Sequence, residues 1–268
     1  MSESPPPPDV LRAFGLAGDP TPLTGGQVGA WRVGGTVLKQ GVDPLHQEWT
    51  GTALGPLDQV GFRLADVRRA GDGRWVVDGW GASGFLPGTS SETGSVDWAT
   101  VLDAGRAFHA ATRALPRPAW LAERSDWWAH GDRAAWGDRT EEVMAPLRPL
   151  VEALEPLLEP LGPDQIVHAD LTGNVLLEPG APPGIIDVSP LWRPAAYAEG
   201  IVVADALCWH GARADLARRT GVSRAAVARS LLFRVLTTEA MQRDRPDPTA
   251  LERDVDHYTA ALPELDRI

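Results

Sequence analysis

The segment that most constrains this chain is residues 166–187, which read IVHADLTGNVLLEPGAPPGIID. Each of its three apolar runs meets a polar residue: Asp170 follows IVH, Asn174 precedes VLL, and Asp187 follows GII. An apolar strand that ends in an acidic residue places a carboxylate at the edge of a buried scaffold. Oxygen ligands that converge from neighbouring turns suit Mg²⁺ and a hydroxyl nucleophile. The pattern therefore indicates metal-assisted chemistry at a strand edge, and we expect VLLEPG and PGIIDV to form a hairpin.

Lysine and asparagine occur only once each, as Lys39 and Asn174. The richness in Ala, Gly, Arg and Pro is typical of a GC-rich genome, where codon drift replaces lysine and asparagine wherever the protein tolerates it. A lysine that persists among so many arginines is expected where arginine does not substitute. An ammonium is a compact point charge and a guanidinium a planar fork, so the two differ most at a tight phosphate site. Both single residues are therefore candidate functional residues.

The residue pattern changes along the chain from strand-like to helical. Residues 1–18 begin with a Pro-rich stretch, and we expect a flexible tail there. Residues 19–88 are rich in short strand patterns and glycines, and their TVLKQ segment reads as a strand with Lys39 near its end. In residues 89–268 apolar side chains recur mainly at helical spacing. We expect an α+β fold with a β-rich N-terminal lobe and a helical C-terminal lobe that carries the catalytic segment.

These features resemble the aminoglycoside phosphotransferase and choline kinase type of small-molecule kinases, which share the protein-kinase-like two-lobe fold. The His-Gly-Asp motif of that family maps onto His168-Ala169-Asp170, and its later asparagine and aspartate map onto Asn174 and Asp187. The resemblance implies a phosphotransferase that moves phosphate from ATP or GTP to a hydroxyl or amino group of a small metabolite or antibiotic. It implies that Asp170 is the catalytic residue and that Asn174 and Asp187 hold Mg²⁺. His168 is expected to hold the loop by packing and hydrogen bonding.

The upstream order of residues also agrees with the family. A glycine turn with Gly25 and Gly26 comes first, then the strand lysine Lys39, then Glu48 in a predicted helix. The resemblance implies that the glycine turn covers the nucleotide phosphates and that Lys39 binds them. It also implies that Glu48 holds the ammonium group of Lys39 in place.

The chain departs from the family in the loop between the catalytic aspartate and the asparagine, which is one residue shorter here. Gly173, within this loop, can adopt a backbone angle that restores the reach. The short loop leaves a second hypothesis open, a nucleotide-binding pseudokinase that acts as a regulatory or scaffolding module. The intact set of charged residues favours the enzyme. A protein kinase is disfavoured, because the helical part contains no recognisable activation segment.

The signals for an acceptor site are aromatic. Trp127, Trp128 and Trp136 lie in SDWWAHGDRAAWGDR, the region where family members place acceptor-binding elements. Such side chains can stack on a sugar or hold a cation, although packing between helices is the favoured interpretation. We expect a small-molecule acceptor that is cationic or sugar-like.

Composition excludes several other classes of protein. The net charge of −11 argues against binding to nucleic acid or to an anionic membrane. The single cysteine, Cys208, excludes a disulfide framework. No apolar run approaches the roughly 18 residues of a spanning helix, and the opening residues lack the pattern of a signal peptide. We expect a cytoplasmic protein.

Overall fold

The structure is a computed structural model that describes residues 4–23, 29–91, 97–139 and 142–268. At the centre of its N-terminal sheet, β3 (Thr36–Gln40) pairs antiparallel with β2 (Ala30–Val33) and β7 (Trp80–Gly84). Further out, β1 (Thr21–Pro22) pairs with β2, while β5 (Val67–Arg68) and β6 (Val76–Val77) both pair with β7. Side chains alternate between the two faces of a strand. Leu38 is therefore buried in the core of this lobe, and Lys39 points to the opposite face.

The first helix of the described chain corrects the expectation of a flexible tail over residues 1–18, as far as residues 4–18 are concerned. Within that range α1 (Pro8–Ala13) packs on the sheet, and its Val10 is fully buried with Leu38 and Trp80. A proline is well suited to the first turn of a helix, where its missing N–H costs nothing. The Pro-rich start is thus a helix start, and burial of one apolar side chain anchors it.

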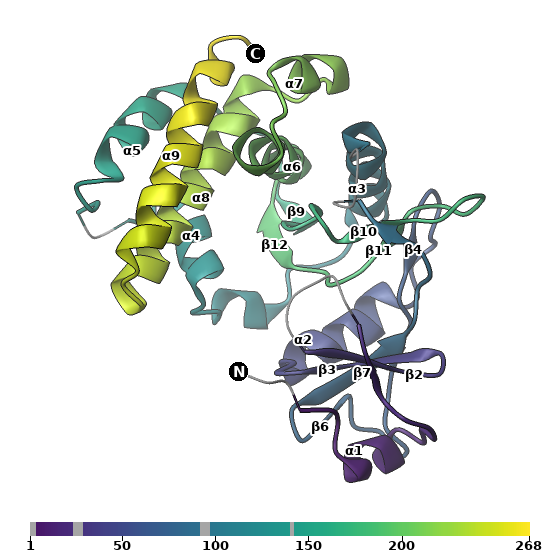
Figure 1. The fold of residues 1–268 in the computed structure, drawn as a ribbon. Helices are drawn as coiled ribbons and strands as arrows, with labels where there is room; N and C mark the ends of the chain where they lie inside the picture. The colour runs from purple at the N-terminus through teal and green to yellow at the C-terminus, as the bar shows by residue number, and fades with distance from the viewer. Residues whose placement is uncertain (1–3, 24–28, 92–96, 140–141) are drawn as a thin grey trace.

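The helix that follows β3 covers the side of the sheet that faces the second lobe (Figure 1). It consists of α2 (Pro44–Trp49) and a π-helical turn, η1 (Thr50–Leu54). The Asp43 side chain caps its start by accepting a hydrogen bond from the backbone N–H of His46 at 2.8 Å.

Two small sheets lie at the junction of the lobes. The expected hairpin is confirmed, since β10 (Val175–Leu177) and β11 (Gly184–Ile185) pair antiparallel. Outside it, β8 (Thr89–Ser90) pairs with β10, and β4 (Arg63–Leu64) pairs parallel with β11. The second sheet joins β9 (Gln165–His168) to β12 (Pro190–Arg193). A segment of the first lobe therefore contributes a strand beside the catalytic segment.

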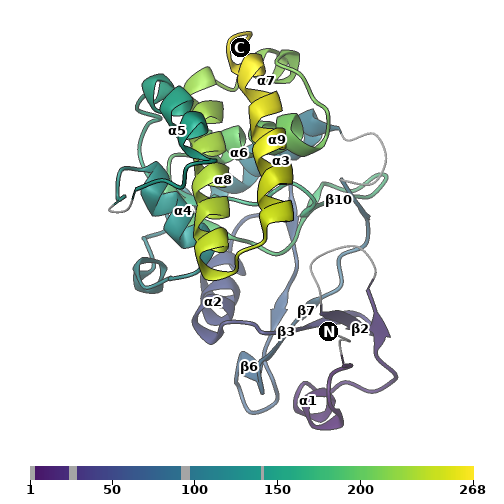
Figure 2. The same ribbon diagram turned by 60° about the vertical axis from the view of Figure 1, so that its left-hand side comes forward.

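The C-terminal lobe is helical, as predicted, and is organised around one long helix (Figure 2). Its helices are α3 (Trp98–Thr112), η2 (Ala119–Ala122), α4 (Trp127–Ala135), α5 (Arg148–Leu154), η3 (Glu155–Leu157), α6 (Ala195–Trp209), α7 (Asp215–Thr220), α8 (Arg224–Asp244) and α9 (Pro248–Leu265). The central helix α8 packs against α4, α5, α6 and α9. Glycines allow the closest crossings: a Cβ on Gly200 would lie 2.4 Å from the carbonyl oxygen of Ala226, and one on Gly131 2.8 Å from the nitrogen of Thr237.

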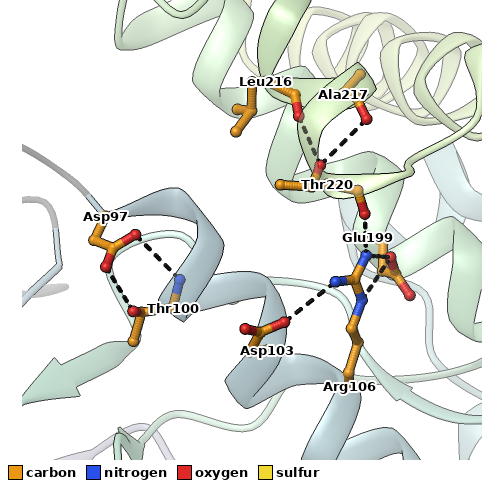
Figure 3. Close-up of polar contacts among 8 residues, drawn as sticks. All are labelled: Asp97, Thr100, Asp103, Arg106, Glu199, Leu216, Ala217 and Thr220. Carbon is orange, nitrogen blue, oxygen red and sulfur yellow. Dashed lines mark hydrogen bonds and ion pairs between the residues drawn. The ribbon is translucent and has the colours of Figure 1, made fainter.

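A single arginine, Arg106, fixes α3 against the rest of this lobe (Figure 3). Arg106 donates to Glu199 at 2.6 Å and to the Thr220 carbonyl at 2.6 Å, and so joins α3 to the start of α6 and the end of α7. The Asp97 side chain caps α3 through Thr100. Within the described part of the chain, no helix has both the length and the apolar character needed to cross a membrane.

Candidate active site

Asp170 lies at the end of a buried strand and opens onto a cleft between the lobes. Every residue of β9 is buried, and the Ala169 N–H donates to the Ser189 carbonyl at 2.9 Å, which fixes the chain just before Asp170. The Asp170 side chain is 35% exposed and borders the cleft. Burial raises the pKa of Asp170 to about 6, against the opposing effect of the nearby Arg234. The position and pKa suit a carboxylate that accepts a proton near neutral pH.

His168 holds the backbone around Asp170 and is neutral. Its Nδ1 accepts a hydrogen bond from the Asp170 N–H at 3.1 Å, so its Nε2 carries the proton and donates to the Ile186 carbonyl at 3.2 Å. Burial lowers the pKa of His168 to about 4 and that of the neighbouring His109 to about 3. His109 Nε2 in turn accepts from the His168 N–H at 3.1 Å. This geometry agrees with the structural role expected for His168.

Asn174 reaches back to Asp170 despite the short loop between them. Its amide nitrogen donates to the Asp170 carbonyl at 2.7 Å and to Oδ2 of the carboxylate at 3.1 Å. Gly173 makes the turn possible with φ of +79°, a left-handed conformation that glycine adopts freely. The amide oxygen of Asn174 makes no hydrogen bond within the described part of the chain. That oxygen remains available as a metal ligand.

Asp187 and Lys39 meet across the lobes. Asp187 follows β11 and has a φ of +51°. Such a left-handed angle is uncommon for a residue other than glycine, and among the described non-glycine residues only Asp78 shares it. Its carboxylate forms an ion pair with the ammonium of Lys39 on β3. The structure therefore brings the strand lysine to the second candidate metal ligand. Gly25 and Gly26, the candidate glycine turn, lie outside the described residues.

The structure does not bring Glu48 to Lys39. Glu48 is exposed, and among the ion pairs of the described residues the partner of Lys39 is Asp187. The α2 side chain that reaches the sheet is Gln47, whose amide donates to the Ala82 carbonyl at 3.2 Å. Consecutive helical residues point about 100° apart, so a sheet-facing Gln47 turns Glu48 towards solvent. The expected role of Glu48 in holding the ammonium has no support in this arrangement.

The cleft beside Asp170 has a volume of about 700 Å³. Its walls come from the start of α2, the segment 120–128, the residues after Asp187 and Phe233 of α8. On one side the centroid of the Trp120 ring lies 5.2 Å from that of His46, in a tilted arrangement, and 5.9 Å from that of Trp49, edge-on. An aromatic cluster of these three side chains therefore joins the lobes. Trp120 and His46 were not singled out by the sequence, because nothing local links η2 to α2.

Few of the acidic side chains around the cleft are free. Asp126 forms an ion pair with Arg124 at 2.8 Å and caps α4, and Asp43 caps α2. Glu123 is exposed at the cleft and takes part in no ion pair among the described residues. The cleft therefore offers Glu123 as a carboxylate that, among the described residues, neither caps a helix nor forms an ion pair, whereas Asp170 lies 3.7 Å from Arg234.

The three tryptophans proposed for the acceptor site separate in the structure. Trp128 is 39% exposed and borders the cleft. Trp136 packs edge-on against the buried Tyr197 in the helical lobe, as the packing interpretation predicts. Trp127 lies beneath the Arg245 guanidinium, 5.1 Å from it. Only Trp128 of the three borders the cleft.

A buried ion pair next to Asp170 was missed by the sequence analysis. Arg234 in α8 donates to both carboxylate oxygens of Asp205 in α6, at 2.8 and 2.7 Å, and its Nη2 lies 3.7 Å from Oδ1 of Asp170. The sequence feature that could have revealed this ion pair is the single charged residue in each of two apolar runs, Asp205 in IVVADAL and Arg234 in SLLFRVL. Such residues are rarely buried without a partner.

The residues present suit Mg²⁺ bound together with a nucleotide. Asn174 offers a free amide oxygen and Asp187 a carboxylate, both ligands that Mg²⁺ accepts. Among the described residues no group of three or more His, Cys, Asp or Glu side chains can hold a metal by itself. Phosphate and water oxygens would have to complete the coordination, as is common for Mg²⁺.

The fold is similar to that of solved small-molecule kinases and phosphotransferases. Three solved structures show the similarity over nearly their whole length. A microcompartment-associated aminopropanol kinase is 18% identical with a TM-score of 0.63, and covers 97% of this chain and 95% of its own. Aminoglycoside phosphotransferase APH(4)-Ia is 16% identical with a TM-score of 0.61, over 94% of this chain and 97% of its own.

The third structure is spectinomycin phosphotransferase APH(9)-Ia in complex with ADP and spectinomycin. It is 13% identical with a TM-score of 0.56, and covers 96% of each chain. No family model matches the sequence, and no curated protein matches it either. The similarity therefore establishes the fold, and the predicted α+β two-lobe architecture is confirmed.

Proposed function

We propose that the protein is a phosphotransferase that transfers the γ-phosphoryl group of ATP or GTP to a hydroxyl or amino group of a small molecule. The observation that carries the proposal is the position of Asp170, which opens onto the interlobe cleft next to Asn174. The meeting of Lys39 and Asp187 across the lobes supports it. The similar structures include complexes with ADP, which supports a nucleotide as the donor.

The proposed phosphoryl transfer needs no reactant other than the nucleoside triphosphate and the acceptor. The acceptor oxygen or nitrogen attacks the γ-phosphorus, and the bond from that phosphorus to the bridging β-phosphate oxygen breaks. The acceptor proton passes to Asp170, and the nucleoside diphosphate leaves. Mg²⁺, held by Asn174 and Asp187, would supply positive charge beside the phosphates. Lys39, which pairs with Asp187, would neutralise phosphate charge beside the metal.

The cleft favours a small acceptor with a positive charge and an apolar part. Among the described residues Glu123 is a cleft carboxylate that neither caps a helix nor forms an ion pair, whereas Asp126 and Asp43 cap helices. The exposed side chains of Trp128 and Leu45 border the same cleft. We therefore propose an amino-alcohol acceptor, with its hydroxyl at Asp170 and its ammonium at Glu123.

The test is phosphate transfer from radiolabelled ATP and GTP, with Mg²⁺, to a panel of amino-alcohols, sugars and aminoglycosides. Wild type is compared with Asp170→Asn, which keeps the size of the side chain and one acceptor oxygen but removes the charge and the ability to accept a proton. General-base contributions are typically about 10²–10⁴-fold. We expect kcat to fall by that factor while nucleotide affinity stays the same. Nucleotide binding by wild type without transfer to any acceptor would favour the pseudokinase hypothesis instead.

A further inference from the structure

Arg234 lies between two acidic side chains, Asp205 and Asp170, and the second of these borders the cleft. Its Nε and Nη2 donate to Asp205, and Nη2 is also 3.7 Å from Oδ1 of Asp170. Arg234 is 10% exposed and Asp205 is 4% exposed. Burial by itself would lower the pKa of Arg234, but the ion pair with Asp205 outweighs this effect, so Arg234 keeps its charge.

Stability alone is a weak reason for this ion pair. Taking an arginine and an aspartate out of water costs several kcal/mol per ion, and well-packed apolar residues often serve as well or better. The lobe has ample apolar residues at the same level of α6 and α8, including Val203 and Leu231. Helix packing therefore does not explain why a charged residue stands at this position, and its contact with Asp170 offers a better explanation.

We propose that Arg234 is a positioning residue for Asp170, an inference that rests on the phosphotransfer function proposed above. Asn174 donates to Oδ2 of the carboxylate, and Arg234 attracts Oδ1 from the other side. The two contacts together restrict rotation of the carboxylate about its Cβ–Cγ bond. Asp205 in turn holds the guanidinium in place through two hydrogen bonds.

This arrangement gives the short catalytic loop a second support. Within the loop, the side chain of Asp170 accepts its hydrogen bond from Asn174, on Oδ2. A misplacement of about 1 Å can cost roughly 10²-fold in rate. An arginine anchored in two rigid helices supplies the missing constraint from outside the loop.

The test is a double-mutant cycle on kcat between Arg234→Lys and Asp170→Asn, followed by radiolabelled phosphate transfer. Lysine keeps the charge but loses the fork that binds Asp205 and the reach to Asp170. We expect Arg234→Lys to lower kcat about tenfold in the wild-type background, within the range of coupling between contacting residues. The KM for nucleotide should not change. In the Asp170→Asn background the same substitution should change kcat less than about twofold.

Arg193→Lys is the matched control. Arg193 binds Asp132 through a similar fork, at 2.8 to 3.1 Å, in the same lobe, and is not among the residues that line the cleft. We expect the Arg193→Lys substitution to lower the stability of the protein and to leave kcat unchanged.

An equal loss of kcat in both Asp170 backgrounds, or no loss in either, overturns the inference, since Arg234 then does not act through Asp170. If Arg234→Lys does not fold, Asp205→Asn enters the same cycle, because it keeps Arg234 and removes the charge of its anchor. Failure of both variants to fold assigns Arg234 to stability and also overturns the inference. A wild-type protein with no phosphate transfer contradicts the proposed function itself, before any variant is compared.

Discussion

Lys39 in β3 forms an ion pair with Asp187, which lies 148 residues further along the chain. The contact joins the lysine of the N-terminal sheet to the carboxylate after β11 in the other lobe. Both side chains are about one-third exposed. The phosphates of a nucleotide bound between the lobes would therefore lie near both side chains. Lys39 would contact them directly, and Asp187 would act on them through Mg²⁺.

Lys39→Arg tests whether the shape of the lysine matters as well as its charge. Arginine keeps the charge and can still pair with Asp187, so thermal stability should change little. Its planar fork fits a compact phosphate contact poorly. We expect nucleotide binding or turnover to weaken at least tenfold, or about 1.4 kcal/mol, measured by calorimetry and steady-state kinetics. Full activity of Lys39→Arg would remove the argument from the single lysine.

Magnesium binding should depend on the nucleotide. Asn174 and Asp187 supply only two protein ligands, and Asp187 is engaged with Lys39. We therefore expect weak Mg²⁺ binding to the protein alone and binding at least about tenfold tighter with a non-hydrolysable ATP analogue. Calorimetric titrations with and without the analogue measure this difference, and Asp187→Asn should reduce it. Tight binding of Mg²⁺ in the absence of nucleotide would contradict the assignment of these ligands.

The stability of the protein should fall as pH decreases below about 6.5, the ordinary pKa of histidine. Burial lowers the pKa of His109 to about 3 and that of His168 to about 4. Below 6.5 the unfolded chain binds protons that the folded protein does not, so each buried histidine lowers the unfolding free energy as pH drops. The loss approaches about 1.4 kcal/mol per pH unit for each.

Urea unfolding between pH 7.5 and 5 measures this dependence. His109→Gln keeps an acceptor for the His168 N–H but does not titrate, so the dependence on pH should become shallower. His130→Gln, at an exposed position of α4, is the control and should leave the slope unchanged. An unaltered slope in His109→Gln would mean that His109 is not neutral in the folded protein.

Glu123→Gln tests the charge preference of the cleft. Because Glu123 is exposed, an ion pair with an ammonium group is worth less than about 1 kcal/mol. We expect the KM for a cationic acceptor to rise about two- to fivefold with kcat unchanged. The KM for a neutral analogue of the same shape should not respond. Glu152→Gln, an exposed change on α5, is the matched control, and an equal effect in both variants would argue against a cation site at Glu123.

The sequence predicted those parts of the fold and site that depend on local pattern. The strand TVLKQ, the buried strand before Asp170 and the hairpin after Asn174 all lie where the sequence places them. Gly173 adopts the left-handed angle expected of it. Alternation, turn residues and strand ends are set by neighbours within a few positions, so a single sequence reveals them.

Contacts between distant segments were decided only by the tertiary structure. Packing selects Gln47 rather than Glu48 to face the sheet, and Asp187 to pair with Lys39. It also buries Val10 in a segment that reads as a tail, and places Arg234 beside Asp170. Each outcome depends on the rotation of a helix or the meeting of two elements far apart in the chain. The sequence by itself determined the elements and the chemistry of the catalytic segment, and packing of the two lobes decided which side chains meet, because that choice depends on burial summed over the whole molecule.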